Sequence, residues 1–173
     1  RNKINSAKKE KFKLKKNTNV VKSSKTKAQE ELLSYSLLDN DIYTYIKNKV
    51  QVFYFTSSMT RAVFEEIPKM FEDEMEVAEF LNLLEKNRLI DFNFKENILG
   101  IIKKIKVNDK VVDELIRSVE KNYLQKKKNK ILEKIEKLQG EESKNLLLET
   151  LNELKEINLK LSELKEEGNY EWK

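Results

Sequence analysis

The sequence contains no cysteine and no histidine among its 173 residues. Without cysteine there are no disulfides and no thiolate nucleophiles, and the usual zinc ligands are missing. Without histidine there is no imidazole for acid–base chemistry near neutral pH. Much enzyme chemistry is thereby excluded, and we expect this chain to be non-catalytic, with no metal-binding or cofactor-binding residues.

Turn residues are scarce as well, with three glycines and one proline. Charged residues make up 38% of the chain, and the rest is rich in helix formers. Folds built from β-strands need frequent turn residues, which this chain lacks. The composition predicts an all-α fold. The apolar patterns along the chain predict its architecture: a compact bundle of five to six helices, joined by a long helix to a C-terminal two-helix hairpin.

Long apolar runs are also missing. No stretch of 18 or more apolar residues is present, and the N-terminal segment lacks the apolar centre of a signal peptide. We expect a cytoplasmic protein with no membrane contact. The first residue is Arg1 rather than methionine, which suggests a fragment of a longer protein.

The positive charge is concentrated at the N-terminus. Residues 1–27 hold eleven lysines and arginines and one acid, a net charge of +10, whereas the remaining 146 residues have a net charge of −5. Apolar periodicity is absent from the first part, so residues 1–26 are predicted to be a basic flexible linker. The alternative is an arm that touches DNA or RNA through its charge.

Apolar stripes at helical spacing predict a bundle subdomain over residues 27–124. Thr26 and Gln29 have the spacing of a capping box at the first helix. Asp39 to Asp41 should end that helix and cap the next, and Pro68 should kink or end the third. The stripes of the first five helices comprise Leu32, Leu33, Tyr35, Ser36 and Leu37; Ile42, Tyr45, Ile46 and Val50; Met59, Val63, Phe64, Ile67 and Phe71; Val77, Phe80, Leu81 and Leu84; and Phe94, Ile98, Ile101, Ile102 and Ile105.

A long helix is predicted from Asn108 to Gly140. Its apolar face changes direction by roughly 80° to 140° on the way, at 100° per residue. Between the two faces lies QKKKNK, Gln125 to Lys130, which is polar all round. A helix of that kind usually bridges through solvent. Residues 125–173 are therefore predicted to form a spacer and a hairpin held away from the bundle.

The last helix is rich in leucine and supplies the candidate binding residues. The predicted hairpin core is Ile131, Ile135, Leu138, Leu147, Leu154 and Ile157. Leu148 and Leu159 fall outside the main stripe on nearly the same heading, so they should be exposed. The predicted partner-binding residues are Leu148, Leu151, Leu159, Leu161 and Leu164.

Two other groups of residues, adjacent carboxylates and clustered aromatics, are candidate sites. Adjacent carboxylates such as Glu65 and Glu66, or Asp73 and Glu74, could bind Mg²⁺, but neighbours on a helix do not face each other. A solvated helix face is the favoured interpretation. The aromatics Phe53, Tyr54, Phe55, Phe92 and Phe94 could stack on bases. They are not interleaved with lysines, so we expect them to anchor the core and loops.

One segment resembles a known family. In AQEELLSYSLLDNDIYTYI, Ala28 to Ile46, the pattern of a leucine-rich helix, a short acidic turn and a second helix is similar to the C-terminal helicase-binding domain of bacterial primase, DnaG. The similarity continues through the phenylalanine-containing loop Val52 to Phe55, the bundle and the long helix that leads into a leucine-rich hairpin, covering residues 28–167.

The resemblance implies a function in DNA replication. Domains of this family bind the N-terminal domains of the replicative helicase DnaB, bringing primase to the fork and tuning helicase activity, while primer synthesis belongs to other parts of the primase. Two alternatives stay open: the N-terminal domain of a replicative helicase, and a nucleic-acid-binding helical protein that uses its basic tail.

Overall fold

The computed structural model of the chain describes residues 24–138 and 144–169, with side chains as far as residue 166. Its described part is all-α, as the composition predicts, and contains seven α-helices and no strand. The elements are α1 (Ser24–Ser36), α2 (Asn40–Lys49), the 3-10 turn η1 (Val52–Tyr54), α3 (Ser58–Glu72), α4 (Val77–Lys86), α5 (Phe92–Ile102), α6 (Asp109–Lys137) and α7 (Lys144–Asn169).

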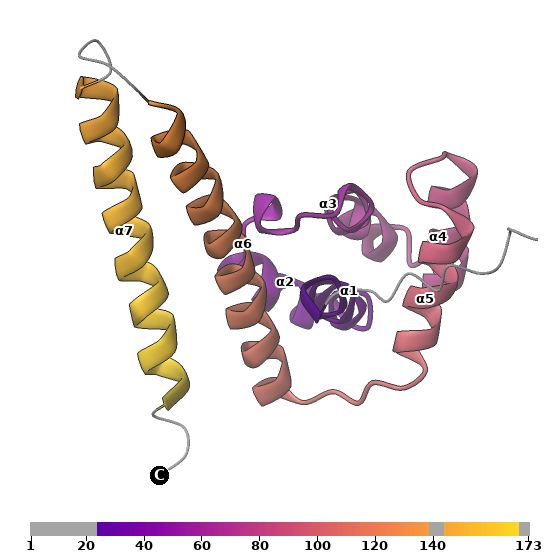
Figure 1. Cartoon of the computed structure of the whole chain (residues 1–173). Coiled ribbons are helices and arrows are strands. Elements are labelled where there is room, and N and C mark those ends of the chain that lie inside the picture. The colour runs from indigo at the N-terminus through magenta and orange to yellow at the C-terminus, as the bar shows by residue number, and fades with distance from the viewer. Residues whose placement is uncertain (1–23, 139–143, 170–173) are drawn as a thin grey trace, which may run out of the picture.

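Helix α1 lies at the centre of the bundle and contacts α2, α3, α5 and α6 (Figure 1). Eight of its thirteen residues are buried, including polar ones. These polar groups have partners: the Ser34 and Ser36 hydroxyls donate to carbonyls one turn earlier, and Asn97 donates to the Glu30 carboxylate at 2.8 Å. Burial of this helix therefore leaves those side chains satisfied.

The predicted capping box at Thr26 and Gln29 is wrong. Helix α1 already begins at Ser24, so residues 24–26, assigned to the linker, are helical; residues 1–23 lie outside the described chain. Gln29 instead joins α1 to the loop before α3. Its side-chain amide donates to the Thr56 hydroxyl at 2.9 Å and accepts from the Thr56 backbone N–H at 2.8 Å. A buried amide takes these long-range partners because leaving it unpaired would be costly.

Two local predictions need correction. Tyr45, expected in the apolar stripe of α2, is exposed, and Tyr43 is buried in its place. Pro68 does not end α3, which continues to Glu72. Phe64 and Ile67 before the proline and Met70 after it are buried in the core, so packing on both sides holds the helix where one backbone hydrogen bond is lost.

Side-chain caps begin three other helices. The Ser57 hydroxyl accepts from the Thr60 N–H before α3, and Asp91 accepts from the Phe94 N–H at the start of α5. Asn108 accepts from the Lys110 N–H at the start of α6. The sequence boundaries of these helices follow from these side chains, which satisfy backbone N–H groups that the first helical turn leaves free.

Helix α6 is shared by two apolar cores. Val112, Ile116 and Val119 belong to the core of the bundle, whereas Leu124 and Ile131 are buried in a second core with α7. At 100° per residue the second pair lies roughly 100° to 120° round the helix from Val112. The predicted change of face within one continuous helix is confirmed.

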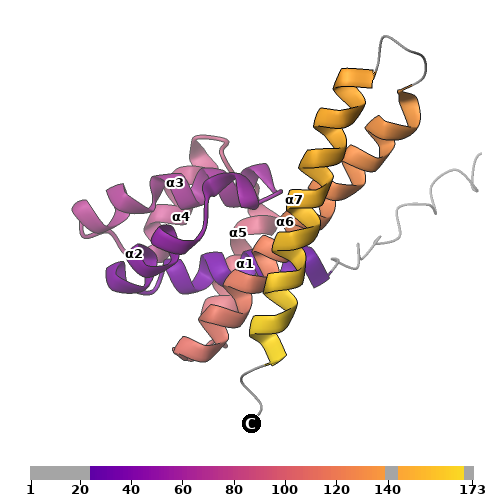
Figure 2. The same cartoon turned by 90° about the vertical axis from the view of Figure 1, so that its left-hand side faces the viewer.

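The hairpin is not held away from the bundle by a polar spacer. Helix α7 runs back beside α6, and both views show the two helices side by side along most of their length (Figures 1 and 2). Lys127, within the predicted spacer, pairs with Glu153 at 3.0 Å. A helix of 26 residues is about 39 Å long at 1.5 Å per residue, so α7 reaches the level of the bundle. The predicted breaker Gly140 lies outside the described residues.

Helices α3 and α4 end with the same backbone turn. The residue after each C-cap has a left-handed conformation, with φ of 49° at Glu74 and 61° at Arg88. The next residue donates its N–H back to the helix, Met75 to the Met70 carbonyl at 2.9 Å and Leu89 to the Leu84 carbonyl at 3.0 Å. These are Schellman motifs, which usually have glycine at the left-handed position. Among the described helices, none is long and apolar enough to cross a membrane.

Replacing Arg88 with glycine should stabilise the protein. Glycine adopts φ of 61° without the steric cost that arginine has there, so we expect Arg88→Gly to raise the free energy of unfolding by up to about 1 kcal/mol. Urea denaturation followed by circular dichroism measures this. The control is Lys121→Gly in the exposed middle of α6, which should lower the free energy of unfolding by about 0.5–1 kcal/mol. A loss of stability in both variants would contradict the strain at Arg88.

Candidate functional site

The α6–α7 hairpin has a small core. Leu124, Ile131, Ile157 and Leu161 are buried in it. Of the residues predicted for this core, Ile131 and Ile157 are buried, Ile135 and Leu154 are half-buried against it, and Leu138 and Leu147 are half-buried outside it. Leu124 was not predicted, because it directly precedes the polar QKKKNK segment and continues no apolar stripe.

The far face of α7 carries exposed leucines. Leu148 and Leu159 are 61% and 62% exposed, as expected from their heading. They are eleven residues apart, which is about 16 Å along a helix at 1.5 Å per residue, and they point within about 20° of each other at 100° per residue. Leu151 is exposed too. The helix thus packs one face on α6 and leaves leucines on the opposite face in solvent.

Two of the predicted partner-binding residues, Leu161 and Leu164, pack within the hairpin instead of facing solvent. Leu161 is only 7% exposed and belongs to the hairpin core, and Leu164 packs against that core. The cause is that α7 runs back along α6 as far as the bundle, so α6 covers the face of α7 that carries these two leucines. A direct contact of these two leucines with a partner would require α7 to leave α6, so the exposed set that remains is Leu148, Leu151 and Leu159.

The tip of the hairpin adds leucines that the sequence did not single out for binding. Leu132 of α6 and Leu146 at the start of α7 are exposed. With Leu148 and Leu151 they place four exposed leucines in the half of the hairpin away from the bundle. Large exposed apolar groups gathered on one element are typical of protein-binding surfaces.

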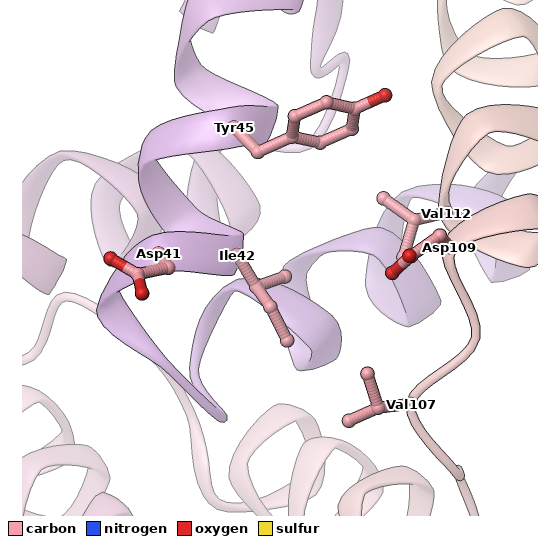
Figure 3. Close-up of a pocket in the computed structure, with 6 residues that line it drawn as sticks. All are labelled: Asp41, Ile42, Tyr45, Val107, Asp109 and Val112. Atoms are coloured by element: carbon pink, nitrogen blue, oxygen red, sulfur yellow. The ribbon is translucent and has the colours of Figure 1, made fainter.

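A pocket of about 290 Å³ lies between α2 and the start of α6 (Figure 3). Its walls are Ile42, Val112, Val107 and the ring of Tyr45, with carboxylates at the rim. Among the described residues, no group of three or more acidic side chains is placed to hold a metal ion. These residues offer a ligand apolar contacts inside the pocket and carboxylates at its rim.

Tyr45, beside this pocket, joins α2 to α6. Its hydroxyl donates to Asp113 at 2.6 Å and accepts from Lys49 at 2.6 Å, and Lys49 lies 3.4 Å from Asp113. The hydrogen bond from Tyr45 is the main cause that lowers the pKa of Asp113 below its usual value, and Lys49 lowers it further. The hydrogen bond with Tyr45 is likewise the main cause that raises the pKa of Lys49.

The aromatic candidates divide into two groups. Phe55 and Phe94 are buried in the bundle core, as expected for anchors. Phe53 and Phe92 are exposed. Phe53 lies against Tyr54 and against Tyr123 of α6, with ring centroids 5.1 Å and 5.4 Å away. This aromatic cluster lies where the bundle core and the hairpin core meet.

Comparison of the chain with models of protein families, with curated proteins and with solved structures finds no match.

Truncation of the hairpin core should loosen α7. We expect Leu161→Ala to destabilise the docked helix by about 2 kcal/mol or more, because a buried leucine loses its contacts and leaves a cavity. Amide hydrogen exchange measures this as faster exchange along α7. Leu159→Ala is the matched control, since its side chain is already in water, and should leave the exchange rates unchanged. Equal effects of the two variants would contradict the orientation of α7.

The Tyr45–Asp113–Lys49 network should contribute to stability at neutral pH and lose that contribution in acid. Because the folded pKa of Asp113 lies below the ordinary value of 3.8, its stabilisation is present above pH 3.8 and disappears as the pH falls through the folded pKa. The contribution is below about 1 kcal/mol, because the pair is exposed. Asp113→Asn should therefore flatten the loss of stability below pH 3.8 in urea titrations, whereas Asp109→Asn, outside the network, should not. An unchanged acid slope in Asp113→Asn would refute this.

Proposed function

We propose that this chain is a non-catalytic helicase-binding domain of a bacterial primase. It docks on the N-terminal domains of the replicative helicase DnaB in the cytoplasm and couples primer synthesis, carried out by other parts of the primase, to unwinding of the fork. The observation that carries the proposal is the row of exposed leucines on α7, Leu148, Leu151 and Leu159, on a helix whose opposite face is already packed.

The arrangement of the elements supports the same function. The segment that resembles the primase family, Ala28 to Ile46, forms α1 and α2, and the acidic turn between them contains the N-cap Asp39, whose carboxylate accepts from the Asp41 and Ile42 N–H groups. Helix α6 packs on the bundle built on α1, runs on without a break and contacts α7, which lies at one side of the molecule (Figure 1). A single amphipathic helix presented in this way suits an apolar groove on a partner.

The exposed leucines of α7 suit a protein partner. Exposed leucines give affinity only when they are desolvated in a complementary pocket. Leu148 and Leu159 would act as two anchors that point in nearly the same direction into a groove, with Leu151 between them along the helix. The polar residues that alternate with them, such as Lys155, keep this face soluble when it is free.

The decisive variant is Leu148→Ser combined with Leu159→Ser. We expect the helical circular dichroism and the melting temperature to change little, because both side chains are in water. Binding to the helicase N-terminal domains from the same organism should weaken at least about tenfold, or about 1.4 kcal/mol. Titration calorimetry measures the dissociation constant.

The matched control is Leu83→Ser combined with Leu89→Ser, two leucines of the α4 region that are also exposed and lie far from α7. This variant should bind the helicase as the unmodified chain does. Failure of the unmodified chain to bind helicase would refute the function. Binding to a primase C-terminal domain instead would support a helicase N-terminal domain, and salt-dependent DNA binding would support the nucleic-acid alternative.

A further inference from the structure

A second apolar surface lies on the side of the bundle away from α7, between α3 and α4 (Figure 1). It is a groove of about 370 Å³. Its apolar lining comes from Met70, Met75, Phe80, Leu83, Leu84 and Leu89. Leu83 and Leu89 are each 42% exposed, so they form open walls, while Met70, Phe80 and Leu84 form a buried floor.

The two Schellman turns place residues in this groove. Met75 and Leu89 occupy the same position in their motifs, one residue after the left-handed Glu74 and Arg88. In such a motif this residue commonly contacts the last turn of its own helix, which explains why it is apolar. That contact does not require Leu83, which lies in the middle of α4 and is exposed. The groove is thus wider than the helix ends alone would make it.

The rim of the groove is acidic. Glu66 and Asp73 line it. Next in the chain to the lining residues Asp73, Met75 and Phe80 come four further exposed acids, Glu72, Glu74, Glu76 and Glu79, in a stretch of eight residues that includes no lysine or arginine. From residue 65 to residue 89 the chain carries eight acids and three basic residues. Lys69, also on the rim, is held by Glu66 at 2.5 Å.

Electrostatic interactions on Lys69 agree with this negative rim. Its pKa is raised, first by the hydrogen bond with Glu66 and to a smaller extent by the charges of Asp73 and Glu72. Lys69, which lines the groove, is therefore engaged with the acids around it.

We propose that the α3–α4 groove binds a basic amphipathic segment of a partner protein. Aliphatic side chains on one face of that segment enter between Leu83 and Leu89 and contact the methionine and phenylalanine floor. Methionine side chains adapt to such anchors because they are unbranched and flexible. Lysines and arginines on the other positions pair with the acidic rim, which favours this sign of charge over an acidic partner. The site goes beyond the helicase contact and does not depend on it.

The test uses the full chain and a labelled synthetic peptide of about 18 residues, with leucines at i, i+3, i+4 and i+7 on one face and lysines elsewhere, the spacing of a helix in a groove. Fluorescence anisotropy should show saturable binding that weakens at least about tenfold in Leu83→Ser/Leu89→Ser and as salt rises from about 0.05 to 0.5 M, where exposed charges are screened. The variant Leu148→Ser/Leu159→Ser should bind the peptide normally.

Four results would overturn the proposal. Equally tight binding of polylysine of the same length would leave a charged surface with no groove. The peptide could bind Leu83→Ser/Leu89→Ser unchanged, or fail to bind the unmodified chain. Lastly, a peptide with the sequence of residues 1–23 could bind in the groove when the leucine–lysine peptide does not, which would make the chain's own basic segment the occupant. Normal helicase binding in any of these cases would leave the proposed function standing.

Discussion

The architecture depends on one helix that serves two apolar cores. Val112, Ile116 and Val119 close the bundle, and after a rotation of the apolar face Leu124 and Ile131 form the hairpin core with α7. Because α6 is continuous, the position at which its apolar face leaves the bundle fixes where α7 can dock. The face of α7 that remains in solvent is then determined as well, and with it the orientation of Leu148 and Leu159.

A largely buried central helix is the second constraint. Helix α1 brings polar groups into the core, and each unpaired one would cost about 1–3 kcal/mol. The amide of Gln29 is satisfied by Thr56 and the carboxylate of Glu30 by Asn97, residues from two different parts of the chain. These bonds specify how the loop before α3 and helix α5 lie against α1, whereas the apolar contacts alone would permit several arrangements.

Helix existence and most helix starts could be predicted from the sequence, because capping side chains and apolar periodicity are local signals. Asp39 and Asn108 begin their helices as expected. The return of α7 along the polar QKKKNK segment could not be predicted in this way. It depends on Leu124, on the length of α7 and on the ion pair between Lys127 and Glu153. The two residues of that pair are distant in sequence. The same return covers Leu161 and Leu164, which were expected to bind a partner, and leaves Leu148 and Leu159 exposed. The groove between α3 and α4 was missed because Leu84 and Phe80 were read as core and their exposed neighbour Leu83 carried no periodic signal.

The two exposed apolar surfaces lie on different sides of the molecule, and we propose that the helicase binds the one on α7. Methyl NMR of leucine-labelled chain, titrated with the helicase N-terminal domains, tests this most directly. We expect large shifts or broadening at Leu148, Leu151 and Leu159, small ones at Leu32 and Leu81 in the bundle core, and none at Leu83 and Leu89. Perturbation confined to Leu83 and Leu89, with the α7 leucines unchanged, would contradict it.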